Sequence, residues 1–222
     1  MKQKNQVSKC YNKTSFEYGE SFFDELTKKS LDRLLLRRFA EENMDKGRIL
    51  DLACGPGQTT HYLARHGLDQ LIGIDLSSGM IKEAQRRNQY QSRATFEQGD
   101  LMDLRFEQGE IGGAICFYGI VHFTLEELEQ ALIEIRRILE VGGQLLFSFH
   151  VGTERRSMEE FLGVQVEEIT FYFFETEAVI HLLKKVGFGL LEVVERHPYP
   201  EAEYPSKRAY ILAQKENVKK DV

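Results

Sequence analysis

Three aspartates, Asp51, Asp75 and Asp100, stand at the ends of three consecutive strand-like segments. A carboxylate accepts two hydrogen bonds at once, which suits the paired hydroxyl groups of a ribose. Asp75 follows Gly57 by 18 residues, near the offset of about 20 at which an acid holds a ribose in nucleotide-binding sheets. A single aspartate at a strand end is usually a turn residue. Three of them favour a ligand site, because the ends of parallel strands meet in one crevice.

The turn Gly55-Pro56-Gly57 joins the first of these strands to a helix-like segment, QTTHYLARHG. Such a turn presents unpaired backbone N–H groups and the positive end of a helix to a ligand. A dinucleotide fingerprint would have a third glycine where this chain has Thr60, and Asp51 would repel a pyrophosphate but attract a cationic amino group. The residues therefore favour a nucleoside with a cationic amino-acid tail and no phosphate, as in S-adenosylmethionine, over a nicotinamide dinucleotide.

An alternation of strands and helices is predicted to position these residues. A helix with a Thr124–Glu127 capping box is the best marked element, and an amphipathic helix is expected over 21–43 after a polar lead-in at 1–19. The last two strands are predicted to pair antiparallel at one edge of an otherwise parallel sheet. The remaining expectations are strands at 48–54, 70–76, 94–100, 112–119, 141–151, 188–195 and 207–214, helices at 58–66, 77–87 and 175–186, and a mixed segment at 152–174.

Composition and charge exclude several classes of protein. The net charge of −6 gives the whole chain no attraction to a nucleic-acid backbone or an anionic membrane. The three cysteines lack CxxC spacing, and no His, Cys or carboxylate set has metal-ligand spacing, so we predict neither disulfides nor a metal. The polar N-terminus is unlike a signal peptide, and no apolar run approaches the ~18 residues of a membrane helix. We therefore expect a cytoplasmic protein that does not enter a membrane.

The motifs together resemble those of the class I S-adenosylmethionine-dependent methyltransferases. ILDLACGPGQ resembles the first motif of that family, LIGIDLSSGMIKEA the second, FEQGDLMDL the third, and residues 112–149 the fourth and following strands with their helix. The resemblance runs in order from about residue 11 to residue 213, with Val141 where many members have a proline. It implies an α/β fold with a doubly wound, mostly parallel seven-stranded sheet whose last strand is antiparallel.

One domain, 1–222, is the simplest division of the chain. We expect a helical N-terminal lid at 1–45, a cofactor-binding half at 46–151 and a substrate-side half at 152–222.

Carried onto this chain, the resemblance implies a site for S-adenosylmethionine, with S-adenosylhomocysteine as its product. The loop from Asp51 to Gly57 would surround the methionine part, Asp75 would hold the ribose hydroxyls, and Asp100 would accept from the adenine amino group. Tyr11 and Tyr18 would close over the cofactor. The full implied set is Tyr11, Tyr18, Asp51, Ala53, Cys54, Gly55, Gly57, Asp75, Leu76, Met80, Gly99, Asp100, Leu101 and Phe117.

The implied reaction is in-line transfer of a methyl group to a small-molecule acceptor, in which the protein aligns the reactants and excludes water. A general base is needed only if the nucleophile must lose a proton, and His122, His150 and Tyr118 are the candidates. Further residues that could line the acceptor pocket, each equally open to a structural role, are Tyr172, Tyr199, Arg208 and Tyr210.

Two other functions stay open on the sequence. One is a non-catalytic module that binds the cofactor or a partner, since the three acids indicate binding without establishing turnover. The other is an RNA or protein methyltransferase, which the acidic charge balance disfavours. The sequence makes no prediction of the accepting atom or of the oligomeric state.

Overall fold

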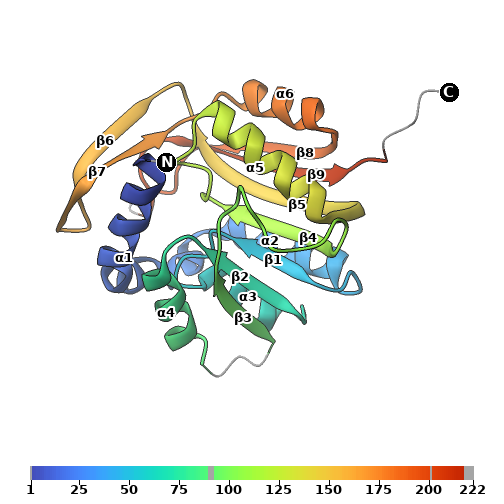
Figure 1. Ribbon diagram of the computed structural model, residues 1–222, viewed down its shortest axis with the longest axis horizontal. Coiled ribbons are helices and arrows are strands. Elements are labelled where there is room, and N and C mark those ends of the chain that lie inside the picture. Colours follow the sequence, from blue (N-terminus) through green and yellow to red (C-terminus); the bar gives the residue numbers. More distant parts are fainter. Residues whose placement is uncertain (1, 90–92, 201, 218–222) are drawn as a thin grey trace.

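Seven strands form one twisted sheet in the computed structural model, which describes residues 2–89, 93–200 and 202–217. Their order is β3-β2-β1-β4-β5-β9-β8, and β9 alone runs antiparallel to its neighbours β5 and β8 (Figure 1). This confirms the predicted fold class and the antiparallel pairing of the last two strands. The strands are β1 (Ile49–Leu52), β2 (Leu71–Asp75), β3 (Ala94–Gln98), β4 (Ile111–Phe117), β5 (Leu139–Val151), β8 (Phe188–Arg196) and β9 (Lys207–Lys215).

The direction of winding reverses between β1 and β4, which follow each other in the sheet but not in the chain. In open α/β sheets such a switch point leaves a crevice at the carboxyl ends of the strands, where ligands bind. The loops after β1, β2 and β4 all begin at this edge. The fold therefore brings the predicted aspartate and glycine positions into one region.

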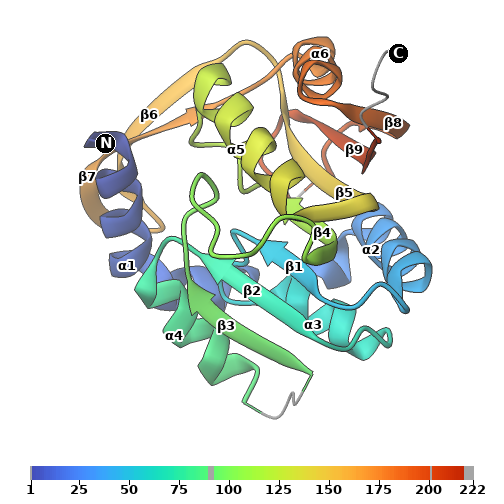
Figure 2. The same ribbon diagram turned by 45° about the vertical axis from the view of Figure 1, so that its right-hand side comes forward.

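Helices cover both faces of the sheet (Figure 2). The predicted capping box begins α5: Thr124 Oγ1 accepts from Glu127 N, and Glu127 Oε2 accepts from Thr124 N at 2.9 Å. No helix in the described part of the chain is long and apolar enough to cross a membrane. The helices after the first strand are α3 (Gln58–Arg65), α4 (Ser78–Arg87), α5 (Leu125–Ile138) and α6 (Thr176–Val186).

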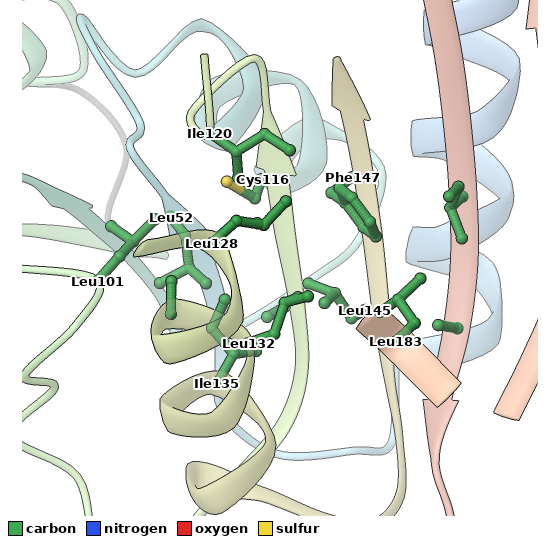
Figure 3. Close-up of a cluster of buried hydrophobic side chains, with 14 of the residues drawn as sticks. Leu52, Leu101, Cys116, Ile120, Leu128, Leu132, Ile135, Leu145, Phe147 and Leu183 are labelled. Carbon is green, nitrogen blue, oxygen red and sulfur yellow. The ribbon is translucent and has the colours of Figure 1, made fainter. Parts of the chain in front are cut away.

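Two apolar clusters hold these layers together. Leu52 in the middle of the sheet packs with Leu128 and Leu132 of α5, and Figure 3 shows Phe147 of β5 in the same cluster. Ile49, on the opposite side of β1, packs with residues of the helices on the other face. Removing one such leucine side chain typically costs 2–5 kcal/mol. The strand ends are thus anchored in a rigid core.

The N-terminal segment differs from the expectation. Residues predicted as a polar lead-in form helix α1 (Lys2–Phe22), and the helix expected over 21–43 is divided into a short 3-10 helix, η1 (Glu25–Lys28), and α2 (Ser30–Asn43). Val7, Cys10 and Thr14 are buried at helical spacing, and α1 lies between α4 and strand β7 (Figure 2). Few apolar residues mark this helix, because polar groups of its neighbours fill much of its contact surface.

The mixed segment at 152–174 contains a hairpin that stands apart from the main sheet. Strands β6 (Arg155–Phe161) and β7 (Val164–Tyr172) pair antiparallel across a turn in which Leu162 and Gly163 both have positive φ angles, +52° and +77°. Met158, Phe161 and Phe171 pack toward α1. The hairpin and α1 therefore form one cover over the carboxyl edge of the sheet.

Candidate functional site

Two adjoining cavities lie under this cover. The smaller, about 120 Å³, lies between α1 and the ends of β1, β2 and β4, and we call it the strand-edge cavity. The larger, about 600 Å³, lies between the hairpin and the β8–β9 connection, and we call it the aromatic cavity. They share a boundary formed by Tyr11, Tyr18, Ala53, Gly55, Phe117 and Tyr118.

Asp75 lines the strand-edge cavity at the end of β2. Its Oδ2 accepts from Gly55 N at 2.9 Å and its Oδ1 accepts from Ser77 N at 2.8 Å. Burial raises the pKa of this carboxyl to about 6, although the two backbone N–H groups oppose the shift. One carboxylate thus holds the glycine turn and the start of α4 together while facing the cavity.

Apolar and acidic groups alternate around the rest of this cavity. Leu76, Met80 and Leu101 supply apolar walls. Asp100 supplies a second acid; its Oδ1 accepts from Met102 N at 3.1 Å and its Oδ2 forms an ion pair with Lys4 Nζ. A lining of apolar side chains with two acids suits a flat, polar-edged ring system joined to a sugar.

Asp51 does not line either cavity. It lies on the α3 side of β1, where its Oδ2 accepts from the hydroxyls of Thr59 and Thr60 at 2.5 and 2.6 Å. Burial raises its pKa to about 6. The structure therefore gives Asp51 the role of fixing the start of α3, and the expected direct contact with a ligand's amino group is not supported.

Two glycines of the predicted set also lie outside the cavity linings. Gly57 caps α3 with φ of +82°, and a Cβ there would approach Asn88 Nδ2 to 2.7 Å. A Cβ on Gly99 would approach Ile74 Cγ2 to 2.7 Å. Both glycines are thus explained by close packing. Ala53, Gly55 and Phe117 line both cavities, and Cys54 lines the aromatic cavity with its thiol pKa raised by burial.

The two candidate histidines lie in different surroundings. His122 lines the strand-edge cavity; its Nδ1 contacts Thr170 O at 2.8 Å, so this nitrogen carries the hydrogen and Nε2 accepts from Tyr11 Oη at 2.8 Å. Burial lowers the His122 pKa to about 4. His150 lines the aromatic cavity with Nδ1 2.7 Å from Ser206 Oγ. Its pKa is also lowered to about 4, by burial and then by the nearby charges of Arg208 and Lys29.

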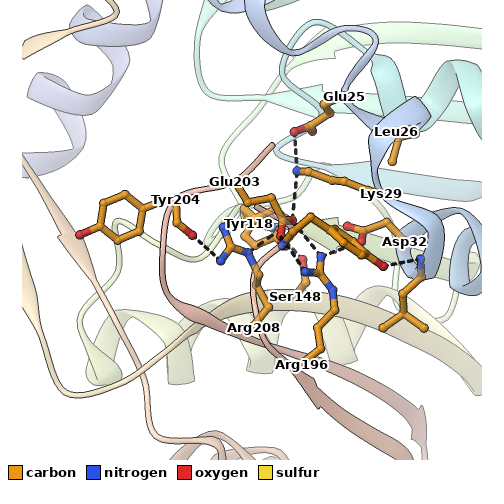
Figure 4. Close-up of polar contacts among 12 residues, drawn as sticks. Glu25, Leu26, Lys29, Asp32, Tyr118, Ser148, Arg196, Glu203, Tyr204 and Arg208 are labelled. Atoms are coloured by element: carbon orange, nitrogen blue, oxygen red, sulfur yellow. Dashed lines mark hydrogen bonds and ion pairs between the residues drawn. The ribbon is translucent and has the colours of Figure 1, made fainter. Parts of the chain in front are cut away.

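Tyr118 stands at the boundary of the cavities in an unusual backbone conformation, with φ of +57°. A non-glycine residue adopts this region only where its surroundings hold it there. Its backbone N donates to Ser148 O at 3.1 Å, and its Oη lies 3.2 Å from Tyr210 Oη. Behind it lies a buried network, shown in Figure 4, whose charged members are Lys29, Asp32, Arg196, Glu203 and Arg208.

The other candidates for the acceptor side fall into two groups, one at or behind the aromatic cavity and one away from both cavities. Arg208 lines the aromatic cavity, and Tyr210 lies behind Tyr118 in the network. Tyr172 and Tyr199 line neither cavity; Tyr199 Oη accepts from Leu31 N at 3.0 Å. In the described residues, no three His, Cys, Asp or Glu side chains are grouped as a metal site.

Sequence reasoning named Tyr11 and Tyr18 but missed the other cavity residues of α1 and the buried charges. Lys4, Val7, Ser8, Tyr11 and Tyr18 line the strand-edge cavity, and their spacing of three, four and seven residues is a helical signal that was present in the sequence. Lys29, Asp32 and Glu203 come from separated segments and carry no such signal.

Known methyltransferases share this architecture. A family model described as a methyltransferase domain matches residues 49–143. The solved magnesium protoporphyrin IX methyltransferase of Synechocystis aligns with a TM-score of 0.72 at 20% identity, covering 96% of this chain and 100% of that one. An S-adenosylmethionine-dependent methyltransferase from Methanosarcina mazei aligns with a TM-score of 0.70 at 17% identity, covering 80% and 97%. These two structures show the fold.

Relatives in sequence show the family to which the chain belongs. The uncharacterized methyltransferase sll0829 of Synechocystis is 30% identical over 159 residues, which cover 68% of this chain and 70% of that protein. The putative methyltransferase YqeM of Bacillus subtilis is 32% identical over 108 residues, or 48% of this chain and 43% of that one. For YqeM and for a malonyl-[acyl-carrier protein] O-methyltransferase of Legionella pneumophila, the chain spans about half the relative's length. The chain belongs to the class I S-adenosylmethionine-dependent methyltransferases.

Proposed function

We propose that this protein binds S-adenosylmethionine with its adenosine part in the strand-edge cavity and transfers its methyl group to a small molecule held in the aromatic cavity. The observation that carries the proposal is the shared boundary of the two cavities at Tyr18, Ala53 and Tyr118. In-line displacement needs the methyl donor and the nucleophile to face each other across such a boundary, with water excluded.

The residues of the strand-edge cavity fit the adenosine part of the cofactor. Asp75 would accept from the ribose hydroxyls, and Asp100 would accept from the adenine amino group in place of its contact with Lys4. Leu76, Met80 and Leu101 would pack against the ring faces. Bound there, the cofactor would supply a methyl group already activated by its sulfonium.

A different pair of side chains replaces Asp51 as partner for the cationic tail. Glu25 and Gln58 line the aromatic cavity next to Gly55, and Gln58 Nε2 donates to Glu25 Oε1 at 3.2 Å. Gln58 Oε1 is buried without a hydrogen-bond partner in the described residues. An ammonium group would satisfy this orphaned acceptor and the adjacent carboxylate. We assign the tail of the cofactor to this corner.

The proposed division of labour follows the chain as one domain. Residues 1–45 cover the cavities, residues 46–151 bind the cofactor, and residues 152–222 build the acceptor side; residues 1, 90–92, 201 and 218–222 lie outside the described structure. Of the proposed catalytic residues, Tyr118 lies on the boundary, whereas both ring nitrogens of His122 are occupied.

Calorimetric titration with S-adenosylmethionine and S-adenosylhomocysteine tests the proposal. We expect binding in the micromolar range, about −8 kcal/mol, for the wild-type chain. Competition by S-adenosylhomocysteine at one site per chain would support it. Folded protein that binds neither compound would refute it.

A further inference from the structure

The hydroxyl groups behind the aromatic cavity have a fixed direction of donation. Asp32, when ionised, only accepts, so Tyr210 Oη donates to Asp32 Oδ2 at 2.9 Å. The one hydrogen of Tyr210 is then used. The contact of 3.2 Å between the two tyrosine oxygens must therefore be a donation from Tyr118 to Tyr210. No side chain of the described residues donates to Tyr118 Oη, so its lone pairs are available to accept a hydrogen bond from a ligand.

The walls of the aromatic cavity favour a flat, uncharged molecule. Phe161 and Phe171 of the hairpin have ring centroids 6.0 Å apart, and Phe173 and Tyr204 have centroids 6.1 Å apart. Aromatic rings bind other flat rings by offset or edge contacts.

The charged groups that line this cavity are already paired within the protein. Lys29 pairs with Glu25 at 2.5 Å, and Arg156 pairs with Glu154 at 3.0 Å. Glu203 accepts from Arg196 at 2.6 Å and lies 3.4 Å from Arg208. Away from the corner of Glu25 and Gln58 that is assigned to the cofactor's tail, a charge on the acceptor would compete with these pairs, whereas a neutral hydroxyl needs only the open acceptor on Tyr118.

We infer that the methyl acceptor is a planar aromatic hydroxy compound whose O–H donates to Tyr118 Oη, and that its proton passes through Tyr210 to Asp32 during methyl transfer. This inference rests on the proposed function of the same site. Tyr118 is the catalytic residue in this scheme, and Tyr210 and Asp32 act through it.

The step balances in atoms and charge. An O–C bond forms on the acceptor while the S–C bond breaks with its electron pair left on sulfur. The acceptor's proton moves to Tyr118 Oη, the Tyr118 proton to Tyr210 Oη, and the Tyr210 proton to Asp32 Oδ2. The positive charge of the sulfonium and the negative charge of Asp32 disappear together. Removing two opposite charges from a buried site lowers the electrostatic cost of the products.

Asp32 is a better proton acceptor than either histidine. Protonating His150 would add a cation beside Arg208 and Lys29, and His122 has no free nitrogen. Asp32 is 1% exposed, and its Oδ1 is buried without a hydrogen-bond partner among the described residues. Arg196 would keep both hydrogen bonds to Glu203, at 2.6 and 2.8 Å, after Asp32 became neutral.

Several charged or titratable groups face this carboxyl and shape its titration. Lys29 precedes it by one helical turn, Arg196 reaches it from β8, and Tyr210 reaches it from β9. Burial raises the pKa of Asp32, while Lys29, Arg196 and the hydrogen bond from Tyr210 oppose this shift.

The first test is binding of 2-naphthol and its methyl ether, 2-methoxynaphthalene, to protein saturated with S-adenosylhomocysteine. The wild type should bind 2-naphthol about 3- to 10-fold more tightly, the contribution of one neutral hydrogen bond. Tyr118→Phe should lose this preference, whereas Tyr172→Phe, at a tyrosine that lines neither cavity, should keep it. Equal affinity for the two probes in the wild type, or no binding of either, would overturn the inference. Failure to bind S-adenosylhomocysteine would instead refute the proposed function.

The second test measures the rate of methyl transfer and its dependence on pH, which report on the proton relay. Wild-type protein should convert 2-naphthol to 2-methoxynaphthalene, and its rate should fall on the acid side as Asp32 becomes protonated. Asp32→Asn should bind 2-naphthol within about threefold of wild type, yet react at least ~100-fold more slowly and without the acid limb. Tyr210→Phe interrupts the relay while keeping Asp32 and gives the same test if Asp32→Asn does not fold. Wild-type rates in either folded variant, or no methylation of bound 2-naphthol by the wild type, would overturn the relay.

Discussion

The acids at the strand edge and the acids of the buried network behind the aromatic cavity are held in opposite ways. At the strand edge, Asp75 is bound by backbone N–H groups of Gly55 and Ser77, and Asp51 by hydroxyls eight and nine residues further along the chain. On the acceptor side, Asp32 is bound by Arg196, 164 residues away, and Glu203 by cations of separate elements. The first group fixes loops locally. The second ties α2, β8 and β9 into one wall.

The difference predicts different consequences of mutation. A backbone N–H freed from a carboxylate costs about one hydrogen bond, and the loop can relax toward water. A buried cation that loses its carboxylate has no such relief, because the surrounding apolar groups cannot solvate it. Acceptor-side acids should therefore control folding, and strand-edge acids should control ligand binding.

The largest effect is expected for Glu203→Ala. Its side chain is 1% exposed and contacts Arg196, Arg208 and Lys29. Burial alone would raise its pKa, but hydrogen bonds from Arg196 and Tyr199 N, with the nearby cations, bring the pKa down to about 2. Removing it leaves the buried Arg208 without a carboxylate partner in the described residues and takes one of two carboxylates from Arg196 and from Lys29, so the free energy of unfolding should fall by about 3–5 kcal/mol. Urea denaturation measures this loss.

Glu154→Ala is the matched control for that experiment, because Glu154 forms an exposed pair with Arg156. Its effect should stay within about 0.5 kcal/mol. A loss in Glu203→Ala no larger than that of the control would show that the network does not stabilise the fold.

Asp75→Ala should weaken ligand binding more than it weakens folding, the reverse of the effect expected for Glu203→Ala. We expect the affinity for S-adenosylhomocysteine to fall by about 100-fold, or 2.7 kcal/mol, because two ribose hydroxyls lose their acceptor. The free energy of unfolding should fall by less than this, about 1–2 kcal/mol for two backbone hydrogen bonds. Calorimetry and urea denaturation on the same preparation compare the two losses. Asp69→Ala, at an exposed surface pair, should leave both quantities unchanged. A larger loss of stability than of binding would break the proposed contrast.

The same contrast explains what the sequence could predict. The loops around Asp75 and Asp100 follow strands in chain order, so alternation and strand-end position were enough to bring these acids together. Asp51 lies one residue away from a core-facing leucine, and the alternation of a strand turned it toward Thr59 and Thr60. The alternation can be read from the sequence. The prediction for Asp51 instead relied on the attraction of a carboxylate for a cationic tail.

The acceptor side could not be predicted in this way. Contacts such as Arg196 with Asp32 depend on how β8 packs behind α2, and no local spacing encodes them. The polar lead-in at 1–19 was not recognised as part of helix α1, because its contact face contains Lys4, Ser8 and Thr14, whose spacing is helical but whose side chains are polar. The sequence therefore predicted which acids meet on consecutive loops and named Tyr118, His150 and Arg208 on the acceptor side, but it did not predict the charged partners that distant elements supply.

A smaller effect should appear on acidification. The raised pKa of Asp75, about 6, means that the empty folded protein holds this proton more tightly than the unfolded chain does. The stability it confers is present below about pH 4 and is lost as pH rises through about 6. Ribose hydroxyls donate to the ionised form, so affinity for S-adenosylhomocysteine should fall about tenfold from pH 7 to pH 5. Asp75→Asn should bind more weakly, with little dependence on pH in this range.

Asp51 supplies the control for this titration, because burial raises its pKa to about 6 as well although it lines neither cavity. Calorimetry at pH 5, 6 and 7 should show that Asp51→Asn retains the decline. Loss of the decline in Asp51→Asn but not in Asp75→Asn would assign the titration to the start of α3.

The smallest effect is expected where the cover meets the strand edge. Lys4 of α1 pairs with Asp100, and the adenine amino group would have to replace it. The Lys4 side chain is 40% exposed, and such pairs contribute about 0.2–1 kcal/mol. Lys4→Met should therefore bind S-adenosylhomocysteine up to about fivefold more tightly. Added salt should strengthen binding to the wild type and leave the variant unchanged, because it screens the competing pair.

Lys9→Met tests whether such a gain comes from the pair with Asp100 or from a looser helix. Lys9 lies on the same helix and pairs with Glu167 of β7, outside both cavities. It should leave the affinity unchanged. If both variants bind more tightly, the whole cover limits access to the cavity. If Lys4→Met binds more weakly, Lys4 contacts the ligand directly, and α1 would then belong to the binding site itself.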